Sequence, residues 1–90
     1  MTAITSTDDI DTCVAFDLMG RGRISASDLT GEYKVNIYEE MPDGTYRLAT
    51  EDGINGLALT AAQPSRNVEL YGNHKAVKSN AAIGDVTYAN

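Results

Sequence analysis

The clearest alternation of apolar and polar positions runs through residues 33–41 and has a period of two. Its apolar members share one parity, with Glu39 interrupting: Tyr33, Val35, Ile37 and Met41. Polar residues take the other parity: Lys34, Asn36 and Glu40. A two-residue period is typical of a strand with one buried face, so this segment is expected to form a half-buried strand.

A turn is expected directly after this strand, at residues 42–45 (Pro-Asp-Gly-Thr). A two-residue Asp43-Gly44 turn pairs Met41 with Tyr46, collects the apolar side chains on one face and sets Glu40 opposite Arg47. A three-residue loop over residues 42–44 instead pairs Glu40 with Tyr46 and divides the apolar set. The side-chain pattern favours the first register.

Shorter strands are expected between the glycines, where β-branched and aromatic residues cluster. They cover residues 12–19, 23–28, 56–60, 67–72, 75–79 and 85–89. Gly20, Arg21 and Gly22 are expected to form a tight reversal between the first two. The side chains expected in the core are Leu57, Leu59, Val68, Leu70, Val77, Val86 and Tyr88.

No segment of ten or more residues has the apolar spacing of an amphipathic helix. The pattern therefore predicts an all-β fold, either a small antiparallel β-sandwich or a partly open β-barrel. Residues 1–11 are polar and acidic, and Ile4 and Ile10 are their large apolar side chains apart from Met1. We expect a flexible N-terminal arm at 1–11 and a single β domain at 12–90.

Composition limits how so short a chain can be stabilised. Ninety residues build one modest core. Cys13 is the sole cysteine, so no intrachain disulfide forms, and His74 is the sole histidine, so no zinc cluster of soft ligands is expected. Association between copies is the remaining aid, and a homo-oligomer is expected.

The net charge of −6 argues against nucleic-acid binding, which relies on a basic surface. No apolar run approaches the roughly 20 residues that span a bilayer, and the N-terminus lacks the pattern of a signal peptide. We therefore expect neither a nucleic-acid nor a membrane partner.

Two polar motifs suggest ligand sites but lack the rest of the pattern. Asp8, Asp9 and Asp11 offer oxygen ligands to a hard cation, yet the spacing of an EF-hand loop is absent, and a solvated acidic segment is the better interpretation. Residues 20–23 (Gly-Arg-Gly-Arg) resemble part of a phosphate loop without its strand-to-helix context. If Arg21 and Arg23 act, they are expected to pair with acidic groups of a partner protein.

No catalytic apparatus is expected. His74 follows Gly72 and Asn73 in what is expected to be a turn, and nothing in the spacing brings it to Cys13, which is better explained as a small buried residue. Glu39 and Glu40 adjoin on one strand and so face opposite sides. We expect no enzyme, no cofactor and no metal site.

Several residues are candidates for partner contacts. Tyr38 lies on the polar parity of its strand, and tyrosine is favoured at protein interfaces. Ile4 and Ile10 could anchor the arm when it adds a strand to a neighbouring sheet. With the arginines, the expected contact residues are Ile4, Ile10, Arg21, Arg23 and Tyr38.

The segments VELYG at 68–72, KAVK at 75–78 and AIGDV at 82–86 resemble small bacteriophage capsid decoration, or cement, proteins. The acidic, β-rich plan with a polar arm is similar too. The resemblance implies a structural virion protein, made in the host cytoplasm, that binds the outer capsid surface and bridges neighbouring major capsid subunits. It also implies a trimer.

Other functions stay open at the sequence level. A phage tail or neck protein, or the capsid anchor of a fibre, shares the same features. A small intracellular β module that binds peptides or carbohydrates is an alternative from a different class. Such a module is expected to be a monomer in solution with an apolar groove.

Overall fold

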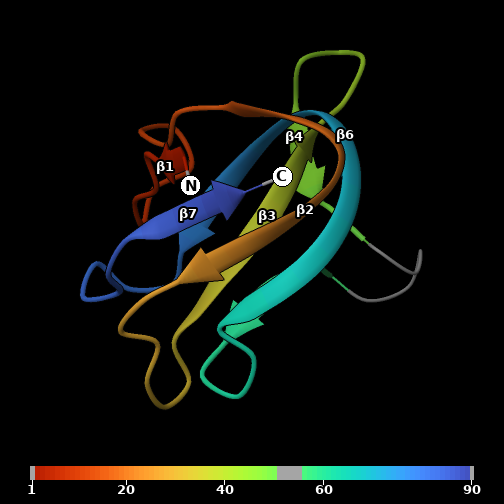
Figure 1. The fold of residues 1–90 in the computed structure, drawn as a ribbon. Coiled ribbons are helices and arrows are strands. Elements are labelled where there is room, and N and C mark those ends of the chain that lie inside the picture. The colour runs from red at the N-terminus through yellow and green to blue at the C-terminus, as the bar shows by residue number, and fades with distance from the viewer. Residues whose placement is uncertain (1, 51–55, 90) are drawn as a thin grey trace.

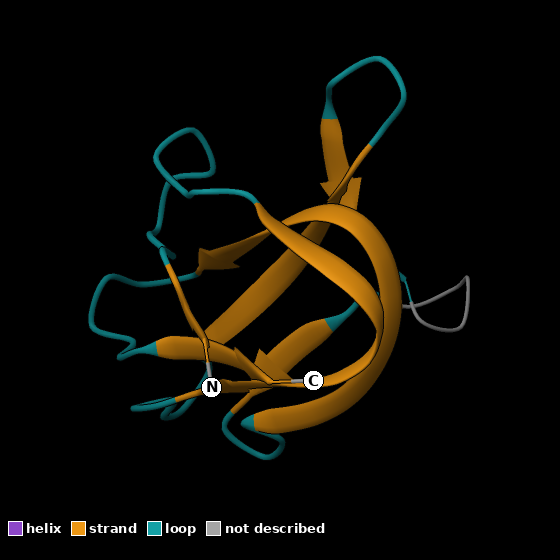
Figure 2. Cartoon of the chain, turned by 45° about the horizontal axis from the view of Figure 1, so that its top comes forward, coloured by secondary structure: helices purple, strands orange, loops and turns teal. Residues whose placement is uncertain are grey.

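The computed structural model describes residues 2–50 and 56–89, and these ranges form seven strands and no helix. The strands are β1 (Thr2–Ile4), β2 (Phe16–Ala26), β3 (Lys34–Glu40), β4 (Tyr46–Leu48), β5 (Ala58–Thr60), β6 (Ser65–Lys78) and β7 (Val86–Ala89). They build one antiparallel sheet in the order β1-β7-β2-β6-β3-β4, with β5 also on β3 (Figure 1). The sheet curves around its core without closing into a barrel (Figure 2), which confirms the expected all-β antiparallel class.

The β2–β6 ribbon is the longest feature of the sheet. β2 and β6 pair at ten consecutive positions, from Phe16 opposite His74 to Ser25 opposite Ser65. β7 joins only the last part of β2, and β3 joins only the last part of β6. The ribbon therefore connects the two halves of the sheet, and its curvature gives the molecule its shape (Figure 1).

The reversal expected at Gly20, Arg21 and Gly22 is wrong, because β2 runs straight through these residues. Gly20 has a φ of 104°, a conformation that glycine adopts without the steric cost of a Cβ atom. A Cβ atom on Gly22 would lie 2.5 Å from the ring of Tyr88 and 2.8 Å from the carbonyl oxygen of Ala89. The two glycines thus allow bending and close packing within one strand.

β6 differs from the expectation in the same way, because it is one strand and not two strands separated by a turn at Gly72 and Asn73. Gly72 has a φ of 93°, yet the strand continues through it. Continuous alternation then buries Ala76 and leaves Val77 half-buried, so the expectation that Val77 lies in the core is wrong. The other inward positions are confirmed as buried: Leu57, Leu59, Val68, Leu70, Val86 and Tyr88.

The β3–β4 hairpin adopts the register that the sequence did not favour. Glu40 pairs with Tyr46, and Glu39 pairs with Arg47. Gly44 is the last residue of a tight turn, and its amide donates to the Met41 carbonyl at 2.9 Å. Its φ of 88° is the left-handed conformation found at this position of three-residue hairpin loops. Loop geometry outweighed the grouping of apolar side chains, and Leu48 is accordingly 42% exposed.

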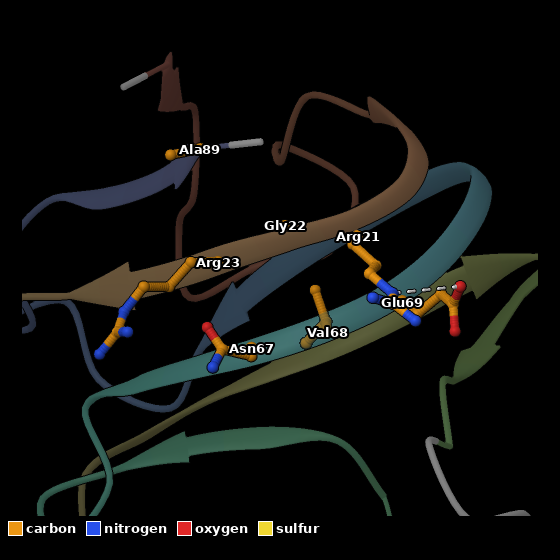
Figure 3. A pocket seen from close by; sticks show the side chains of 7 residues that line it. All are labelled: Arg21, Gly22, Arg23, Asn67, Val68, Glu69 and Ala89. Atoms are coloured by element: carbon orange, nitrogen blue, oxygen red, sulfur yellow. Dashed lines mark ion pairs between the residues drawn. The ribbon is translucent and has the colours of Figure 1, made fainter.

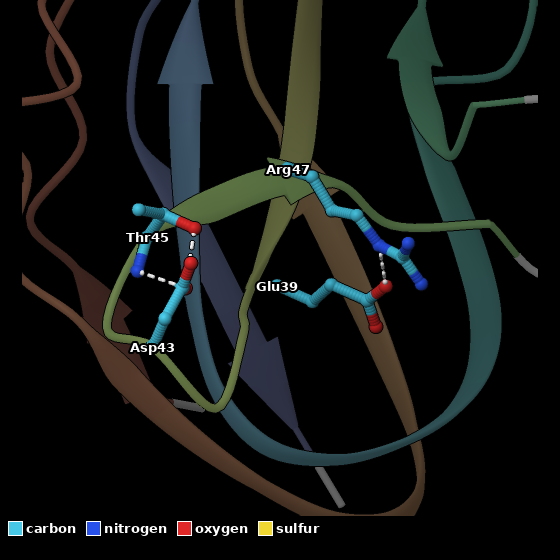
Figure 4. Close-up of polar contacts among 4 residues, drawn as sticks. All are labelled: Glu39, Asp43, Thr45 and Arg47. Carbon is cyan, nitrogen blue, oxygen red and sulfur yellow. Dashed lines mark hydrogen bonds and ion pairs between the residues drawn. The ribbon is translucent and has the colours of Figure 1, made fainter.

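Asp43 and Thr45 close this loop (Figure 4). The Asp43 carboxylate accepts hydrogen bonds from the Thr45 hydroxyl at 2.6 Å and from its amide at 3.0 Å. These bonds stabilise the charged form and hold the pKa of Asp43 below its usual value. Beside the loop, Arg47 Nε donates to Glu39 Oε1 at 3.0 Å, so the expected Glu40–Arg47 pair is replaced by Glu39–Arg47.

The first residues of the expected flexible arm belong to the sheet. β1 pairs with β7, and Ile4 is 8% exposed within the core cluster. β2 begins opposite His74, so the rest of β6 has no β2 neighbour, and the segment after β1 takes that place: Thr7 O accepts from the Lys78 amide at 2.7 Å. The Ser6 hydroxyl likewise donates to Ala76 O at 2.6 Å. Unpaired backbone groups on β6 thus attract the polar segment.

Gly22→Ala is expected to destabilise the fold by about 1–3 kcal/mol, because the new methyl group overlaps the Tyr88 ring and the Ala89 carbonyl oxygen. The Ala89 backbone is held in the sheet and cannot move freely. Chemical denaturation measures the change. Gly56→Ala is the matched control: its methyl group would lie 3.6 Å from Leu48, an ordinary contact, and the expected change is within about 0.5 kcal/mol. Equal effects of the two substitutions would contradict the close packing at Gly22.

Asp43→Ala is expected to lower the unfolding midpoint at pH 7, since it removes the charged acceptor for Thr45. The folded pKa lies below the unfolded one, so this stabilisation is complete above the ordinary carboxyl pKa of about 3.9 and is lost as pH falls through the lowered value. Thermal unfolding measured from pH 7 to pH 2 should therefore show that the difference in unfolding midpoint between wild type and variant becomes smaller in acid. A constant difference would contradict the assignment.

Candidate protein-binding face

Side chains at odd-numbered positions of the β2–β6 ribbon point away from the core and form what we call the outer face. Its members on β2 are Asp17, Met19, Arg21 and Arg23, and on β6 they are Asn67, Glu69, Tyr71 and Asn73. Even-numbered neighbours such as Leu18, Ile24 and Leu70 are buried. Because the strand period is two, burial of one parity forces the other outward.

Met19 and Tyr71 form the apolar centre of the outer face. They are directly opposite each other across the ribbon. Their exposed fractions are 73% and 68%, the highest among the large hydrophobic residues of the described chain. Ring atoms of Tyr71 lie 3.8 Å from the place where Gly20 would carry a Cβ, so the ring covers the glycine as well as facing solvent. An exposed methionine beside an exposed tyrosine offers contact area to another molecule.

Charged and polar side chains lie next to this apolar centre, toward the end of the ribbon that pairs with β7. Arg21 Nε lies 3.8 Å from Glu69 Oε1, and both side chains are largely exposed. Arg23 Nε donates to Ser65 Oγ at 2.6 Å, which orients its guanidinium. The four side chains Arg21, Arg23, Asn67 and Glu69 stand around an open hollow, floored by Gly22 and Val68 and bounded by Ala89 (Figure 3). Two arginines and one glutamate make the hollow positive on a chain of net charge −6.

The outer face continues onto β3 and β4. Tyr38 lies opposite Lys75 of β6, and Glu40 lies opposite Tyr46. Glu40 Oε2 accepts from Tyr46 Oη and from Asn73 Nδ2, each at 3.2 Å. Lys75 Nζ stands 4.8 Å from the centre of the Tyr46 ring, a cation–π contact.

This cluster changes the titration of Tyr46. Burial, the Glu40 charge and the hydrogen bond to Glu40 together raise the pKa of Tyr46 above its usual value. Lys75 Nζ also donates to the carbonyl oxygen of Ile10 at 3.0 Å, which ties the loop after β1 to the same surface.

Three of the five expected contact residues lie on one surface: Arg21, Arg23 and Tyr38. Ile10 is half-buried. Ile4 differs from the expectation, because its side chain packs in the core and does not face a partner. Met19 and Tyr71 were not singled out from the sequence. Alternation within the expected strand at residues 67–72 already directs Tyr71 outward when Leu70 faces inward. Only the β2–β6 register places Met19 opposite it and makes the two side chains one apolar centre.

Cys13 and His74 are buried in separate hydrogen-bonding surroundings. Cys13 is 5% exposed, and its thiol donates to the carbonyl oxygen of Ala76 at 3.2 Å. His74 lies inside β6 at 1% exposure rather than in the expected turn, and Nδ1 donates to Gly72 O at 2.9 Å. Its Nε2 has no hydrogen-bond partner in the part of the chain that the structure describes. Neither side chain reaches the outer face.

The acidic segment after β1 is folded on itself. The carbonyl oxygen of Asp9 accepts from the amides of Thr12 at 3.1 Å and Cys13 at 3.2 Å, and its carboxylate accepts from the Asp11 amide at 3.0 Å. Across residues 2–50 and 56–89, no three His, Cys, Asp or Glu side chains are grouped so that they could hold a metal ion.

Comparison with known proteins finds no matching family model, no matching curated protein and no matching solved structure. Over the described residues, none of the chain forms a helix of the length and apolarity that a membrane crossing requires. The outer face is therefore interpreted from its own residues.

Glu40→Gln is expected to lower the pKa of Tyr46 part of the way to its ordinary value, because the charge is removed while burial, the larger cause, remains. Absorbance titration of the tyrosinates measures this, and Tyr46→Phe identifies the transition that belongs to Tyr46. Asp85→Asn, which neutralises an exposed acid elsewhere, should leave that transition unchanged. An unaltered Tyr46 titration in Glu40→Gln would disprove the coupling.

Proposed function

We propose that this chain is a structural virion protein that binds the outer surface of a phage capsid through its outer face and stabilises the shell by bridging neighbouring major capsid subunits. The observation that carries the proposal is the exposed Met19–Tyr71 pair at the centre of that face. The resemblance of the sequence at residues 68–72, 75–78 and 82–86 to capsid decoration proteins supplies the partner.

The composition of the face supports a protein partner. Protein interfaces are enriched in tyrosine, methionine and arginine, with apolar centres and polar rims. Here Met19 and Tyr71 stand at the centre and Arg21, Arg23 and Glu69 at the rim. Their backbone belongs to the β2–β6 ribbon, which is anchored by β7 at one end and by β3 at the other. Docking on such a surface orders little additional chain and so loses little entropy.

The stabilising mechanism follows from mass action. A protein that binds an assembled, expanded shell more tightly than free capsid subunits lowers the free energy of the assembled state. Subunits bridged by the bound protein then separate only when its contacts break. The acidic chain suits the outside of the particle, away from packaged nucleic acid.

Co-sedimentation tests the proposal directly. The probe is an empty, expanded shell assembled from the major capsid protein encoded in the same genome, with free capsid subunits and an unrelated particle as controls. Saturable binding at a fixed copy number, with greater resistance of the shell to heat, is the expected result. Absence of binding to shells would overturn the proposal, and binding to isolated tails or necks instead would establish the tail or neck alternative.

Met19→Ser combined with Tyr71→Ser is expected to weaken shell binding by about tenfold or more, since central aromatic and apolar contacts carry most interface energy. Val14→Ser is the matched control, because Val14 is 57% exposed but precedes β2 and lies off the outer face. Circular dichroism and thermal unfolding check that both variants are folded. Equal binding by the double variant and the wild type would exclude the outer face as the docking surface.

A further inference from the structure

Over the described residues, one long edge of the sheet has no neighbouring strand. β7 pairs with β2 only from Arg23 to Ala26, and β6 occupies the opposite side of β2 along its length. Within the described chain, no strand pairs with the β7 side of β2 between Phe16 and Gly22. An unpaired edge of this length is a template for another strand.

Hydrogen bonds beside the end of β2 identify the backbone groups at the open edge. The Ala26 amide donates to Pro64 O on the β6 side, whereas the Ser27 amide donates to Asp85 O on the β7 side. Direction alternates along a strand, and the β2–β6 register continues without a break to Phe16. The N–H and C=O groups of Asp17, Met19 and Arg21 therefore point out of the open edge.

We propose that this edge pairs with the same edge of a second copy of the chain, antiparallel, with a twofold axis at Met19. The free stretch ends before Arg23, which pairs with Ala89 of β7, so a symmetric pairing of residues 16–22 is centred on Met19. In that register Met19 lies opposite Met19 of the second copy, and Asp17 lies opposite Arg21 of the second copy. Each of these pairs exchanges two backbone hydrogen bonds.

Charge complementarity selects a second copy as the occupant. Asp17 and Arg21 are on the same outer face, with Met19 between them, so the twofold axis sets an acid opposite a base on both sides of the centre. Opposite charges directly across an antiparallel pair stabilise it, and like charges destabilise it. Arg21 has room for the new contact, because its side chain is 89% exposed and its Glu69 partner is 3.8 Å away.

Pairing would also enlarge the outer face. Two copies joined at this edge present both Met19–Tyr71 pairs on one continuous surface, flanked by the hollows near Ala89 (Figure 3). Specific protein interfaces usually bury about 800 Å² on each partner, which a single two-stranded ribbon supplies poorly. The inference goes beyond shell binding and stands without it, since association is measured on the protein alone.

Sedimentation equilibrium of the full chain over a wide concentration range tests the proposal. The wild type is expected to reach a dimer. Arg21→Asp and Asp17→Arg each set like charges opposite one another, and each should raise the dimer dissociation constant by about tenfold or more. The double swap Asp17→Arg with Arg21→Asp restores complementarity and should restore dimerisation. Arg23→Asp makes the same charge change on the same face beyond the free stretch, and it should leave the constant within about twofold of the wild-type value.

Hydrogen exchange locates the contact. The Met19 and Arg21 amides should exchange rapidly in dilute protein and slowly at concentrations that favour the dimer, whereas the Leu18 and Gly20 amides, bonded to β6, stay protected throughout. A monomer at every concentration would show that the exposed charges of Asp17 and Arg21 prevent edge-to-edge pairing instead. That result, a trimer, or a dimer unaffected by Arg21→Asp would overturn the proposal.

Discussion

Uninterrupted pairing of β2 with β6 is the constraint on which the rest of the structure depends. The register holds from Phe16 opposite His74 to Ser25 opposite Ser65, and it fixes the parity of every side chain between them. Leu18, Ile24, Val68 and Leu70 are thereby directed into one core. The same constraint turns Met19, Arg21 and Tyr71 outward, so the core and the candidate binding face are two consequences of one register.

Curvature follows from where glycine replaces a side chain in this ribbon. Gly20 and Gly72 adopt positive φ angles, and Gly22 lets Tyr88 of β7 pack against the backbone. The curved ribbon can then contact β7 with one end and β3 with the other. Beyond the first residue of β2, the segment after β1 supplies hydrogen bonds to the rest of β6. These local solutions let a chain of ninety residues enclose a core without helices in its described part.

The sequence predicted the strand period, the all-β class and most inward side chains, because a strand with one buried face carries apolar residues at alternate positions. It did not predict continuity. A glycine that bends a strand and a glycine that reverses it look alike in sequence, so residues 20–22 and Gly72 were misinterpreted as turns.

The hairpin register depended on the αL conformation of Gly44, which outweighed apolar grouping. Ile4 was assigned to an arm because its neighbours are polar, although its pairing partner Val86 lies far along the chain. Arg21, Arg23 and Tyr38 share the outer face, but the juxtaposition of Met19 with Tyr71 follows only from the pairing of β2 with β6.

Interproton contacts in the ribbon, measured by NMR, test this account most directly. The odd-numbered residue pairs between β2 and β6 are the non-hydrogen-bonded ones, where opposing Cα atoms approach to about 4.5 Å. Strong Hα–Hα contacts are therefore expected between Met19 and Tyr71 and between Arg21 and Glu69. If the chain instead reversed at Gly20 to Gly22, the contacts would join Met19 to Arg23, and both the outer face and the open edge of β2 would cease to exist.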